Sequence, residues 1–374
     1  MAKRVSRAIA VVAALPLLAL AACGSGNSGA GTSKSGGTAE TATAKRMIQP
    51  YLDKPSAFPI TQLLRKSPAG KKIAYMDCGT PICALFYQIS EPAAKALGMT
   101  LTRIDTGQAA DTVGSAFDTA VSGGYDGVFV PAIPPSLWQR GLDALHAKGI
   151  PVVTTGVTGA DASKIAVRQV SEQIVKQTGE LLAAYVVAEH GANVDAVLYK
   201  TPELPFVEVL SEAFQKEMKV LCGSCKVRTA DIPAASLGSK APSIVVDDLQ
   251  AHPDTKTVVF GVGEQANGLA AAMKAAGLNG VEMIANSPTP ETLQQIKDGS
   301  IKAGLALDLA VIGWTAVDSL ARLTTGQKAD PGAVADTPPI QFLTKSNLPA
   351  DVSHGWTGYP DFAKRFTTLW KSAS

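Results

Sequence analysis

Five cysteines are the side chains whose spacing most directly suggests chemistry in this 374-residue chain. Cys222-Gly-Ser-Cys225 has the C-x-x-C spacing of redox-active disulfides, and Cys78 and Cys83 form a second close pair. Four cysteines in an exported chain predict two disulfides, because exported proteins meet an oxidising environment. Close spacing favours Cys78 with Cys83 and Cys222 with Cys225, although the cross pairings stay open at this stage.

The residues around Cys222 and Cys225 bear on whether that pair is catalytic. A redox-active C-x-x-C motif begins at a helix N-terminus, where the helix dipole lowers the pKa of the first thiol. Here residues 219–221 and 226–229 flank the motif and predict a strand or its approach. We therefore expect a structural disulfide, with a thiol–disulfide oxidoreductase as the less favoured alternative.

The fifth cysteine, Cys23, closes the stretch Leu20-Ala-Ala-Cys23. Three basic residues and an apolar run over residues 8–20 precede it, and this run is too short to cross a bilayer as a helix. Small side chains let the scissile bond enter a narrow peptidase site, and the Cys23 thiol can accept a diacylglycerol group. The box resembles that of bacterial lipoproteins. It predicts a lipoprotein signal peptide at residues 1–22 and a lipid such as palmitate on Cys23, with an ordinary secretory signal as the alternative.

A segment rich in Gly, Ser and Thr follows and predicts a flexible tether over residues 23–46. Such a segment buries too little apolar surface to offset the entropy lost on ordering. No later apolar run reaches transmembrane length without a charge or a Pro or Gly interruption, so the lipid is the expected anchor. We expect the protein to be held on the extracytoplasmic face of the cell membrane.

Charge and missing motifs exclude several functions. The formal net charge of +2 includes three basic and no acidic residues of the signal peptide, which leaves −1 for the rest, so nucleic acid is not an expected partner. The four histidines lack metal-binding spacing, and the sequence has no nucleophile elbow, P-loop or dinucleotide fingerprint. We expect no metal, no cofactor and no enzymatic activity.

From residue 71 onward, short apolar runs alternate with amphipathic helical segments. The expected strands lie at residues 73–76, 101–104, 127–130, 150–154, 165–167, 196–199, 220–221, 257–260, 281–284 and 302–307. The expected helices lie at residues 82–97, 109–122, 136–148, 172–190, 206–218, 243–250, 265–276, 290–297, 314–323 and 362–371. This alternation predicts an α/β fold of two similar doubly wound parallel-sheet lobes. The last two helices follow no strand, and we expect them to brace the lobes.

Residues 71–326 resemble the type I periplasmic binding proteins of the ribose- and galactose-binding kind, which serve ABC importers. The segments that carry the resemblance by order and spacing are 91–98, 124–130, 147–153, 251–254 with 258–260, and 296–299. The resemblance implies two α/β lobes joined by a three-crossover hinge that closes on a ligand.

The resulting division of the chain has four parts after the tether. We expect an N-terminal lobe at 47–157, a C-terminal lobe at 158–306, a return to the N-terminal lobe at 307–335, and a segment at 336–374 that braces the C-terminal lobe. Residues 46–68 are rich in proline and apolar side chains, which predicts an extended arm against the N-terminal lobe.

The resemblance also places the ligand contacts, and several of them depart from sugar binders. After the first strand, sugar binders have an Asn-Pro followed by aromatic residues that stack on the sugar ring, and this chain has Gly-Thr-Pro-Ile-Cys at 79–83 instead. After the third strand, sugar binders have a carboxylate that binds sugar hydroxyls, and this chain has Pro-Ala-Ile-Pro-Pro at 131–135. The ligand contacts implied for this chain are Thr80, Ile82, Ile133, Trp138, Glu203, Phe206, Glu264, Asn286 and Asp308. For four of these a structural role is the alternative: core packing for Trp138 and Phe206, and helix capping for Glu203 and Glu264.

The implied cleft is less polar than a sugar site requires, because each buried sugar hydroxyl needs a hydrogen-bond partner. Sugar is therefore the family default, and a ligand with an apolar or aromatic part is an equal alternative. We expect a monomeric solute-binding lipoprotein that delivers a small molecule to an ABC permease, with a ligand-sensing lipoprotein for a membrane receptor as the alternative. A Cys78–Cys83 disulfide would stiffen a loop at the ligand and reduce the entropy lost on binding.

Overall fold

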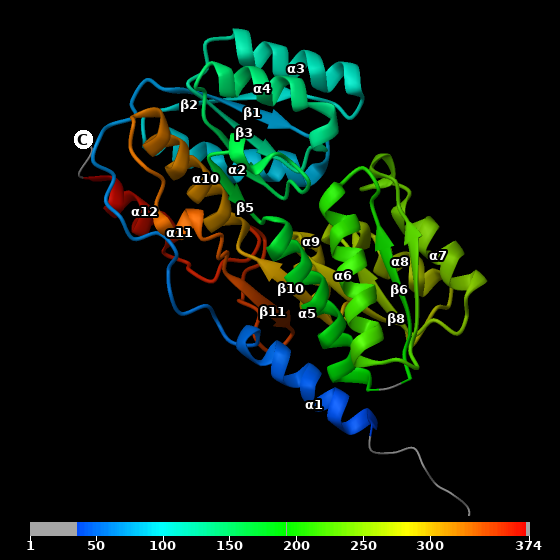
Figure 1. The fold of residues 1–374 in the computed structure, drawn as a ribbon. Coiled ribbons are helices and arrows are strands. Elements are labelled where there is room, and N and C mark those ends of the chain that lie inside the picture. Colours follow the sequence, from blue (N-terminus) through cyan, green and yellow to red (C-terminus); the bar gives the residue numbers. More distant parts are fainter. Residues whose placement is uncertain (1–35, 192, 372–374) are drawn as a thin grey trace, which may run out of the picture. The chain divides into compact units, whose positions relative to one another are not determined.

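Two sheets organise residues 36–191 and 193–371, the part of the chain that the computed structural model describes (Figure 1). The N-terminal lobe has a five-stranded parallel sheet in the order β2-β1-β3-β4-β5. Its strands are β1 (Lys72–Asp77), β2 (Thr100–Asp105), β3 (Gly127–Pro131), β4 (Val152–Thr155) and β5 (Val167–Gln169). Its helices are α2 (Pro81–Ala96), α3 (Ala110–Ser122) and α4 (Gln139–Ala147), with short 3-10 turns at Pro135–Leu137 and Ala162–Lys164.

The C-terminal lobe has a six-stranded sheet in the order β11-β10-β9-β8-β6-β7. Its strands are β6 (Asp195–Lys200), β7 (Lys226–Asp231), β8 (Thr257–Phe260), β9 (Glu282–Asn286), β10 (Ala303–Leu307) and β11 (Ile340–Thr344). Strand β11 pairs antiparallel with β10, and the other pairs are parallel. The helices are α5 (Glu172–His190), α6 (Pro205–Leu221), α7 (Ala241–Ala251), α8 (Leu269–Ala275) and α9 (Pro290–Asp298).

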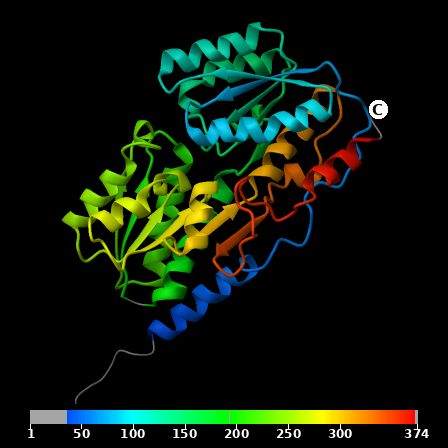
Figure 2. The ribbon, with the colours of Figure 1, turned by 180° about the vertical axis from the view of Figure 1, so that it is seen from behind.

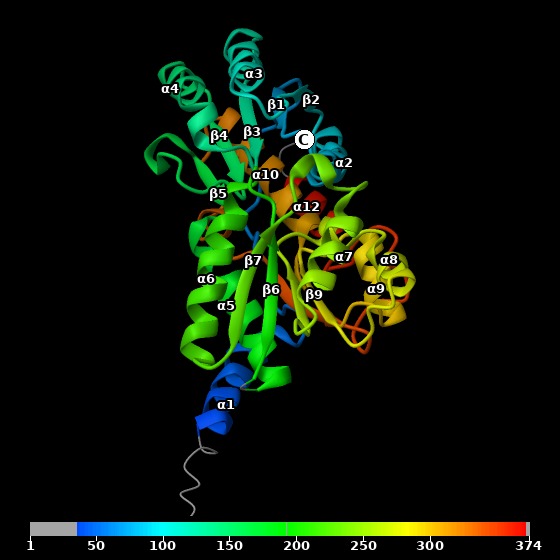
Figure 3. The ribbon, with the colours of Figure 1, turned by 90° about the vertical axis from the view of Figure 1, so that its right-hand side faces the viewer.

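Helices cover both faces of each sheet, which explains why the central strands are apolar throughout. Figure 3 shows α5 and α6 on one side of the C-terminal sheet and α7, α8 and α9 on the other. Every residue of β3, β4, β8 and β10 is buried, as expected for strands of a parallel sheet enclosed between two helical layers. This is the doubly wound α/β architecture that the alternation of strands and helices predicts.

The chain passes between the lobes at three closely placed crossovers. It leaves the N-terminal lobe between β5 and α5, and returns between β10 and α10 (Leu309–Thr324), which packs on α2. After the short helix α11 (Pro331–Val334) it enters the C-terminal sheet again as β11. The second crossover is held by Asp308, whose carboxylate accepts a hydrogen bond from the Val311 N–H at the start of α10.

Two strand predictions are wrong in detail. Residues 220–221 belong to helix α6 rather than to a strand, because Leu221 continues the apolar face of the helix and is buried in the core. The strand lies in the continuation, at Lys226–Asp231, and covers residues 226–229, which were expected to form a strand or its approach. Strand β11 has no predicted counterpart. It is a five-residue edge strand that follows two helices in succession. The regular alternation of strands and helices therefore did not predict it.

The terminal segments also differ from expectation. Helix α1 (Gly36–Ile48) occupies part of the predicted tether and packs against α5, with Ala44 and Ile48 buried at the contact (Figure 1). Of the segment 336–374, β11 joins the C-terminal sheet, whereas helix α12 (Phe362–Trp370) packs on α10 through Trp314 and Trp370 (Figure 2). The packing of a few apolar side chains decides both positions.

The signal peptide, Cys23 and the first part of the predicted tether lie outside the described residues. No helix within residues 36–191 and 193–371 is long and apolar enough to cross a membrane.

Candidate ligand-binding site

A cavity that is partly open to solvent lies where the carboxyl ends of the two sheets face each other. Its walls are formed by segments that follow β1, β3, β4 and β5 in one lobe and β8, β9 and β10 in the other, together with the start of α6. The lining residues are Ile82, Cys83, Phe86, Pro131, Ala132, Thr155, Gly156, Val170, Phe206, Val262, Gly263, Glu264, Ser287, Leu307 and Leu309. The carboxyl ends of parallel strands are the usual place for ligands in open α/β sheets.

The surface of this cavity is mainly apolar. Phe86 and Ile82 contribute from α2, and Phe206 contributes from the first turn of α6 in the other lobe. Thr155 and Ser287 add hydroxyl groups, and Glu264 is the one charged side chain among the described lining residues. The cavity therefore offers few polar groups to orient a ligand.

Glu264 is 3% exposed and lies in the 3-10 turn Gly263–Ala266 that follows β8. Burial raises the pKa of its carboxyl from 4.5 to about 7, and the backbone N–H of Ile82, which donates to the carboxylate from the first turn of α2, opposes this shift. Its Oε2 atom has no hydrogen-bond partner within the described residues. Glu264 therefore joins the two lobes through Ile82 and keeps one acceptor atom for another group.

Of the nine predicted contacts, the structure brings Ile82, Phe206 and Glu264 to the cavity. Three others have polar groups already bound within the protein. The Thr80 hydroxyl contacts Cys78 Sγ at 3.1 Å. Asn286 Nδ2 donates to the Gly261 carbonyl at 3.0 Å, while Asn286 Oδ1 is buried without a partner within the described residues. Asp308 accepts hydrogen bonds from the N–H groups of Val311 and Gly358 and from the Thr357 hydroxyl, and burial raises its pKa to about 6.

The remaining three predicted contacts lie beside a second cavity or in the core. Ile133 and Glu203 line that second cavity together with Cys78, and Glu203 Oε2 accepts a hydrogen bond from the Ala234 N–H. Trp138 is 1% exposed, stacks on Phe117 and donates through Nε1 to the Ile133 carbonyl. Its surroundings are those of a core residue.

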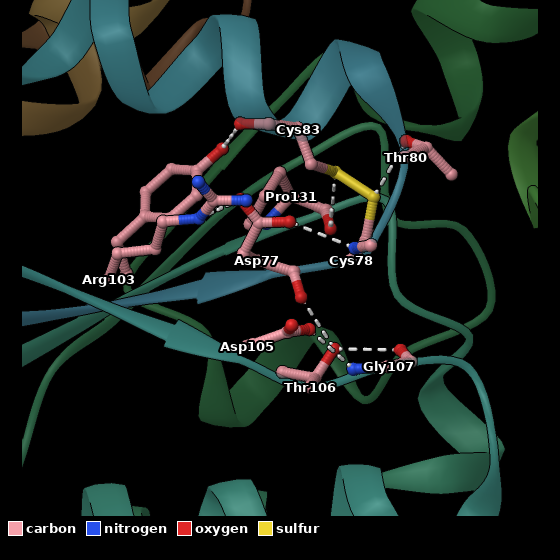
Figure 4. The surroundings of a disulfide bond; sticks show 11 residues. Asp77, Cys78, Thr80, Cys83, Arg103, Asp105, Thr106, Gly107 and Pro131 are labelled. Carbon is pink, nitrogen blue, oxygen red and sulfur yellow. Dashed lines mark hydrogen bonds and ion pairs between the residues drawn. A yellow bond between two sulfur atoms is a disulfide. The ribbon is translucent and has the colours of Figure 1, made fainter. Parts of the chain in front are cut away.

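A disulfide joins Cys78 and Cys83, as predicted, with Cα atoms 5.7 Å apart (Figure 4). Cys83 lines the main cavity and Cys78 lines the second one, so the disulfide lies in the wall between them. Asp77, the last residue of β1, holds the loop that contains Cys78. Its Oδ1 accepts from the Gly79 N–H at 2.9 Å, and its Oδ2 pairs with Arg103 Nε at 2.7 Å. The first turn of α2 is thereby held in place beneath the ligand site.

Backbone strain gathers at the same cavity. Three of the lining residues, Ala132, Val170 and Ser287, have φ near +48°, a region that side chains with a Cβ rarely adopt. Val170 is β-branched, and its conformation is held by Asp336, whose carboxylate accepts from the N–H groups of Val170 and Ser171 at 2.7 and 2.8 Å. The first crossover is thus tied to the third directly beside the cavity. Strained residues of this kind concentrate at functional sites.

Sequence reasoning missed much of the lining. The missed residues include Phe86, Thr155, Gly156, Val170, Val262, Leu307 and Leu309, whereas Pro131 and Ala132 belong to the loop 131–135 that the resemblance placed at the ligand. Most of them end a strand or follow one within two residues, so the carboxyl ends of the predicted strands were the signal that could have found them.

The second disulfide, Cys222–Cys225, lies at the amino end of β7, whereas the cavity lies at the carboxyl ends of the strands. Cys222 ends α6, and Cys225 precedes β7, with Cα atoms 5.4 Å apart. A helix C-terminus carries a partial negative charge and does not favour a thiolate, in contrast to the N-terminal placement of a redox motif. Cys225 Sγ also accepts a hydrogen bond from the Val194 N–H. The predicted structural role fits this placement.

A family model described as periplasmic binding protein domain matches residues 80–328. The chain belongs to this family. Its members are solute-binding proteins rather than enzymes, and the family includes sugar-binding subunits of ABC transporters. The thiol–disulfide oxidoreductase alternative is not favoured, and the family is one of periplasmic or extracytoplasmic binding proteins.

Solved structures with the same type I periplasmic binding protein fold support this assignment. The ABC sugar transporter subunit of Rhodobacter sphaeroides 2.4.1 is 21% identical, with a TM-score of 0.65 over 75% of this chain and 100% of that chain. A solute-binding protein of Burkholderia graminis C4D1M in complex with D-arabinose is 19% identical, with a TM-score of 0.64 over 76% and 99%.

A carbohydrate transporter protein of Acidothermus cellulolyticus 11B, solved with myo-inositol, is 20% identical, with a TM-score of 0.62 over 82% of this chain and 100% of that chain. None of the curated proteins matches this chain. At these identities the solved structures show a shared fold and leave the ligand of this chain open.

Proposed function

We propose that this protein is the extracytoplasmic solute-binding lipoprotein of an ABC importer. It captures a small molecule in the cavity between its lobes and delivers it to a membrane permease. The observation that carries the proposal is a cavity lined by the strand ends of both sheets, the usual place of ligands in open α/β sheets. Glu264 and Ile82 already make a contact across it, which a ligand could extend.

The comparisons support a small polar or partly polar solute as the starting class. The proteins from Burkholderia graminis and Acidothermus cellulolyticus were solved with D-arabinose and myo-inositol. This chain differs from sugar binders at residues 79–83 and 131–135, and its cavity lining is mainly apolar. Both features favour a ligand with an apolar or aromatic part. We propose that the protein acts as a monomer, with each chain providing both walls of the cavity.

A thermal-shift screen of the purified full chain against sugars, polyols, amino acids and small aromatic compounds tests this function. At least one compound should raise the melting temperature in proportion to the logarithm of its concentration above the dissociation constant. The shift should disappear in Leu309→Trp, which fills the cavity, and persist in Leu63→Trp, which enlarges a leucine that is 51% exposed. A broad panel without any stabilising compound would contradict solute binding.

The lipid anchor has its own test. Cys23 lies outside the described residues, so the proposal rests on the lipobox, the basic start and the short apolar run. The intact protein should fractionate with membranes and carry an acyl mass increment on Cys23. The variant Cys23→Ser should lose that increment, and an unmodified Cys23 in the native protein would rule out the anchor.

A further inference from the structure

The hydrogen-bonding capacity of the main cavity limits what it can hold. A sugar needs a partner for each hydroxyl group that leaves water, because a buried hydroxyl without a hydrogen-bond partner destabilises the complex. Thr80 and Asp308, which would supply such partners, are bound within the protein, and Asn286, whose buried Oδ1 has no partner within the described residues, is not among the lining residues. The lining itself adds side-chain polar groups at Thr155, Ser287 and Glu264 among mainly apolar residues. This surface matches a ligand with one polar end and an apolar body.

The charge of the cavity indicates the nature of that polar end. Glu264 faces no Lys, Arg or His among the described lining residues, and the one donor that opposes its desolvation is the N–H of Ile82. Its Oε2 atom is buried and has no partner within the described residues. A buried carboxylate without a counter-charge gains most from a cationic donor, which supplies both a charge and a hydrogen bond. An anionic ligand would meet like charge.

The remaining walls suit the body of an organic cation. Phe86 and Phe206 line the cavity from opposite lobes, and Ile82, Val262 and Leu309 complete an apolar surface. Aromatic side chains attract cations through the negative faces of their rings, and apolar surface favours hydrocarbon attached to the cation.

We propose that the ligand of this cavity is a small organic amine, with its ammonium group bound to Glu264 and its aromatic or aliphatic body packed between Phe86 and Phe206. This inference rests on the proposed solute-binding function, because it names the chemical class of the solute. It makes Glu264 the residue that determines specificity for a cation over a sugar.

Matched sets of probes test this class. Benzylamine, 2-phenylethylamine and cyclohexylamine are compared with benzyl alcohol, benzoate and myo-inositol by calorimetry and thermal shift on the full chain at pH 8. The amines should bind at least about tenfold more tightly than benzyl alcohol, because a charge-assisted hydrogen bond is stronger than a neutral one. Benzoate and myo-inositol should bind more weakly still.

Two variants with the same change of charge separate a specific role from a general one. Glu264→Gln should remove the preference for benzylamine over benzyl alcohol while keeping the fold, because the amide is isosteric and can still accept from Ile82. Glu291→Gln lies on α9, where its carboxylate accepts from the Gly268 N–H outside the cavity, and should leave the preference unchanged. Circular dichroism melting checks that both variants fold.

Each other outcome has a distinct meaning. Tightest binding by myo-inositol or another polyol would overturn the amine class and leave the solute-binding function standing. Preference for the alcohol or for benzoate, or an amine preference that survives in Glu264→Gln, would overturn the role of Glu264. Failure of every compound in this panel and in the broader screen would overturn both the amine class and the proposed function.

Discussion

Glu264 should make the stability of the protein depend on pH. The carboxyl ionises near pKa 4.5 in the unfolded chain and near 7 in the folded chain, because burial raises its pKa. Between these values the folded chain keeps a proton that the unfolded chain has lost. The stabilising contribution is therefore complete below pH 4.5 and is lost as pH rises through 7. The loss amounts to up to about 3 kcal/mol.

Urea denaturation at pH 5 and pH 8 measures this effect. The free energy of unfolding of the native chain should fall between these values by more than that of Glu264→Gln, which cannot ionise. Asp308, whose pKa burial also raises, contributes equally to both proteins and cancels in the difference. Equal pH dependence of the two proteins would show that Glu264 is not protonated in the folded state.

Other titratable groups near Glu264 are present in both the native chain and Glu264→Gln, so their effect on unfolding cancels in the difference. The elements packed against its turn are β8, β9, α7 and α9. The titratable side chains on these elements are Asp247, Asp248, Glu282, Glu291, Lys297 and Asp298. The shift of Glu264 arises first from burial and then from the opposing N–H of Ile82, so these groups do not set it.

Asp336 is expected to hold the strained backbone at the first crossover. Its carboxylate accepts from the N–H groups of Val170 and Ser171, and replacing it by Ala leaves two donors without a partner at a positive-φ valine. We expect Asp336→Ala to lower the free energy of unfolding by about 1–3 kcal/mol. Chemical denaturation measures the change. Asp351→Ala is the matched control, since Asp351 bonds within its own exposed loop to Ser353. Equal effects of both variants would contradict a clamp at the crossover.

At the scale of elements, most of the fold could be predicted from periodicity, because each buried strand and amphipathic helix carries its own pattern. Helix α5 coincides with the prediction at residues 172–190. Helix α1 could not be predicted, since GGTAETATAKRMI is weakly apolar and becomes helical where Ala44 and Ile48 meet α5. Strand β11 depends likewise on its partner β10.

The candidate site was predictable to a smaller extent. The loops that line the cavity follow from the positions of the strand ends. Which side chain in a loop faces the cavity depends on local bonds that no pattern reveals, as when Asp308 turns to cap α10 and contact Thr357. Trp138 similarly turns to stack on Phe117.

The Cys78–Cys83 disulfide fixes the start of helix α2, and we expect it to contribute more to ligand affinity than to the free energy of unfolding. Its short loop, with a sequence separation of 5, limits the entropic stabilisation to about 2 kcal/mol. Replacing both residues by Ser should free the first turn of α2 and add an ordering cost when ligand binds. The loss of binding free energy for the best stabilising compound, by calorimetry, should exceed the loss of unfolding free energy.

A matched double variant controls for the loss of a disulfide as such. Cys222→Ser with Cys225→Ser removes a bridge between α6 and β7, away from the cavity lining. Ligand affinity should stay unchanged in it. Unchanged affinity in the Cys78 and Cys83 variant as well would contradict a role for this disulfide in binding.

At the scale of the whole described chain, the arm that follows α1 links the C-terminal lobe to α10 and to helix α12. After α1, the Leu52 carbonyl accepts from Gln341 on β11, and the Tyr51 hydroxyl accepts from Gln177 on α5. Further on, the Leu63 carbonyl accepts from Arg322 on α10, and the Leu64 N–H donates to the Leu369 carbonyl on α12. The arm and the C-terminal helix therefore form one connected layer beside the crossovers.

Trp370 should be the residue on which this layer depends. Its ring stacks on Trp314 at 5.4 Å, and its Nε1 donates at 2.8 Å to Asp318, which is also paired with Arg322. Trp370→Ala should lower the free energy of unfolding by about 3–5 kcal/mol, because it leaves a cavity and removes a donor from a buried carboxylate. Thr368→Ala, an exposed change on the same helix, should alter it by less than about 0.5 kcal/mol.

Hydrogen exchange distinguishes a connected layer from a local loss of packing. Because Asp318 orients Arg322, and Arg322 donates to the carbonyls of Gln62 and Leu63, loosening α12 should also loosen the arm. Amide exchange in residues 60–66 should therefore speed up in Trp370→Ala together with that of α12. Faster exchange confined to α12 would show that Arg322 holds the arm independently of the C-terminal helix.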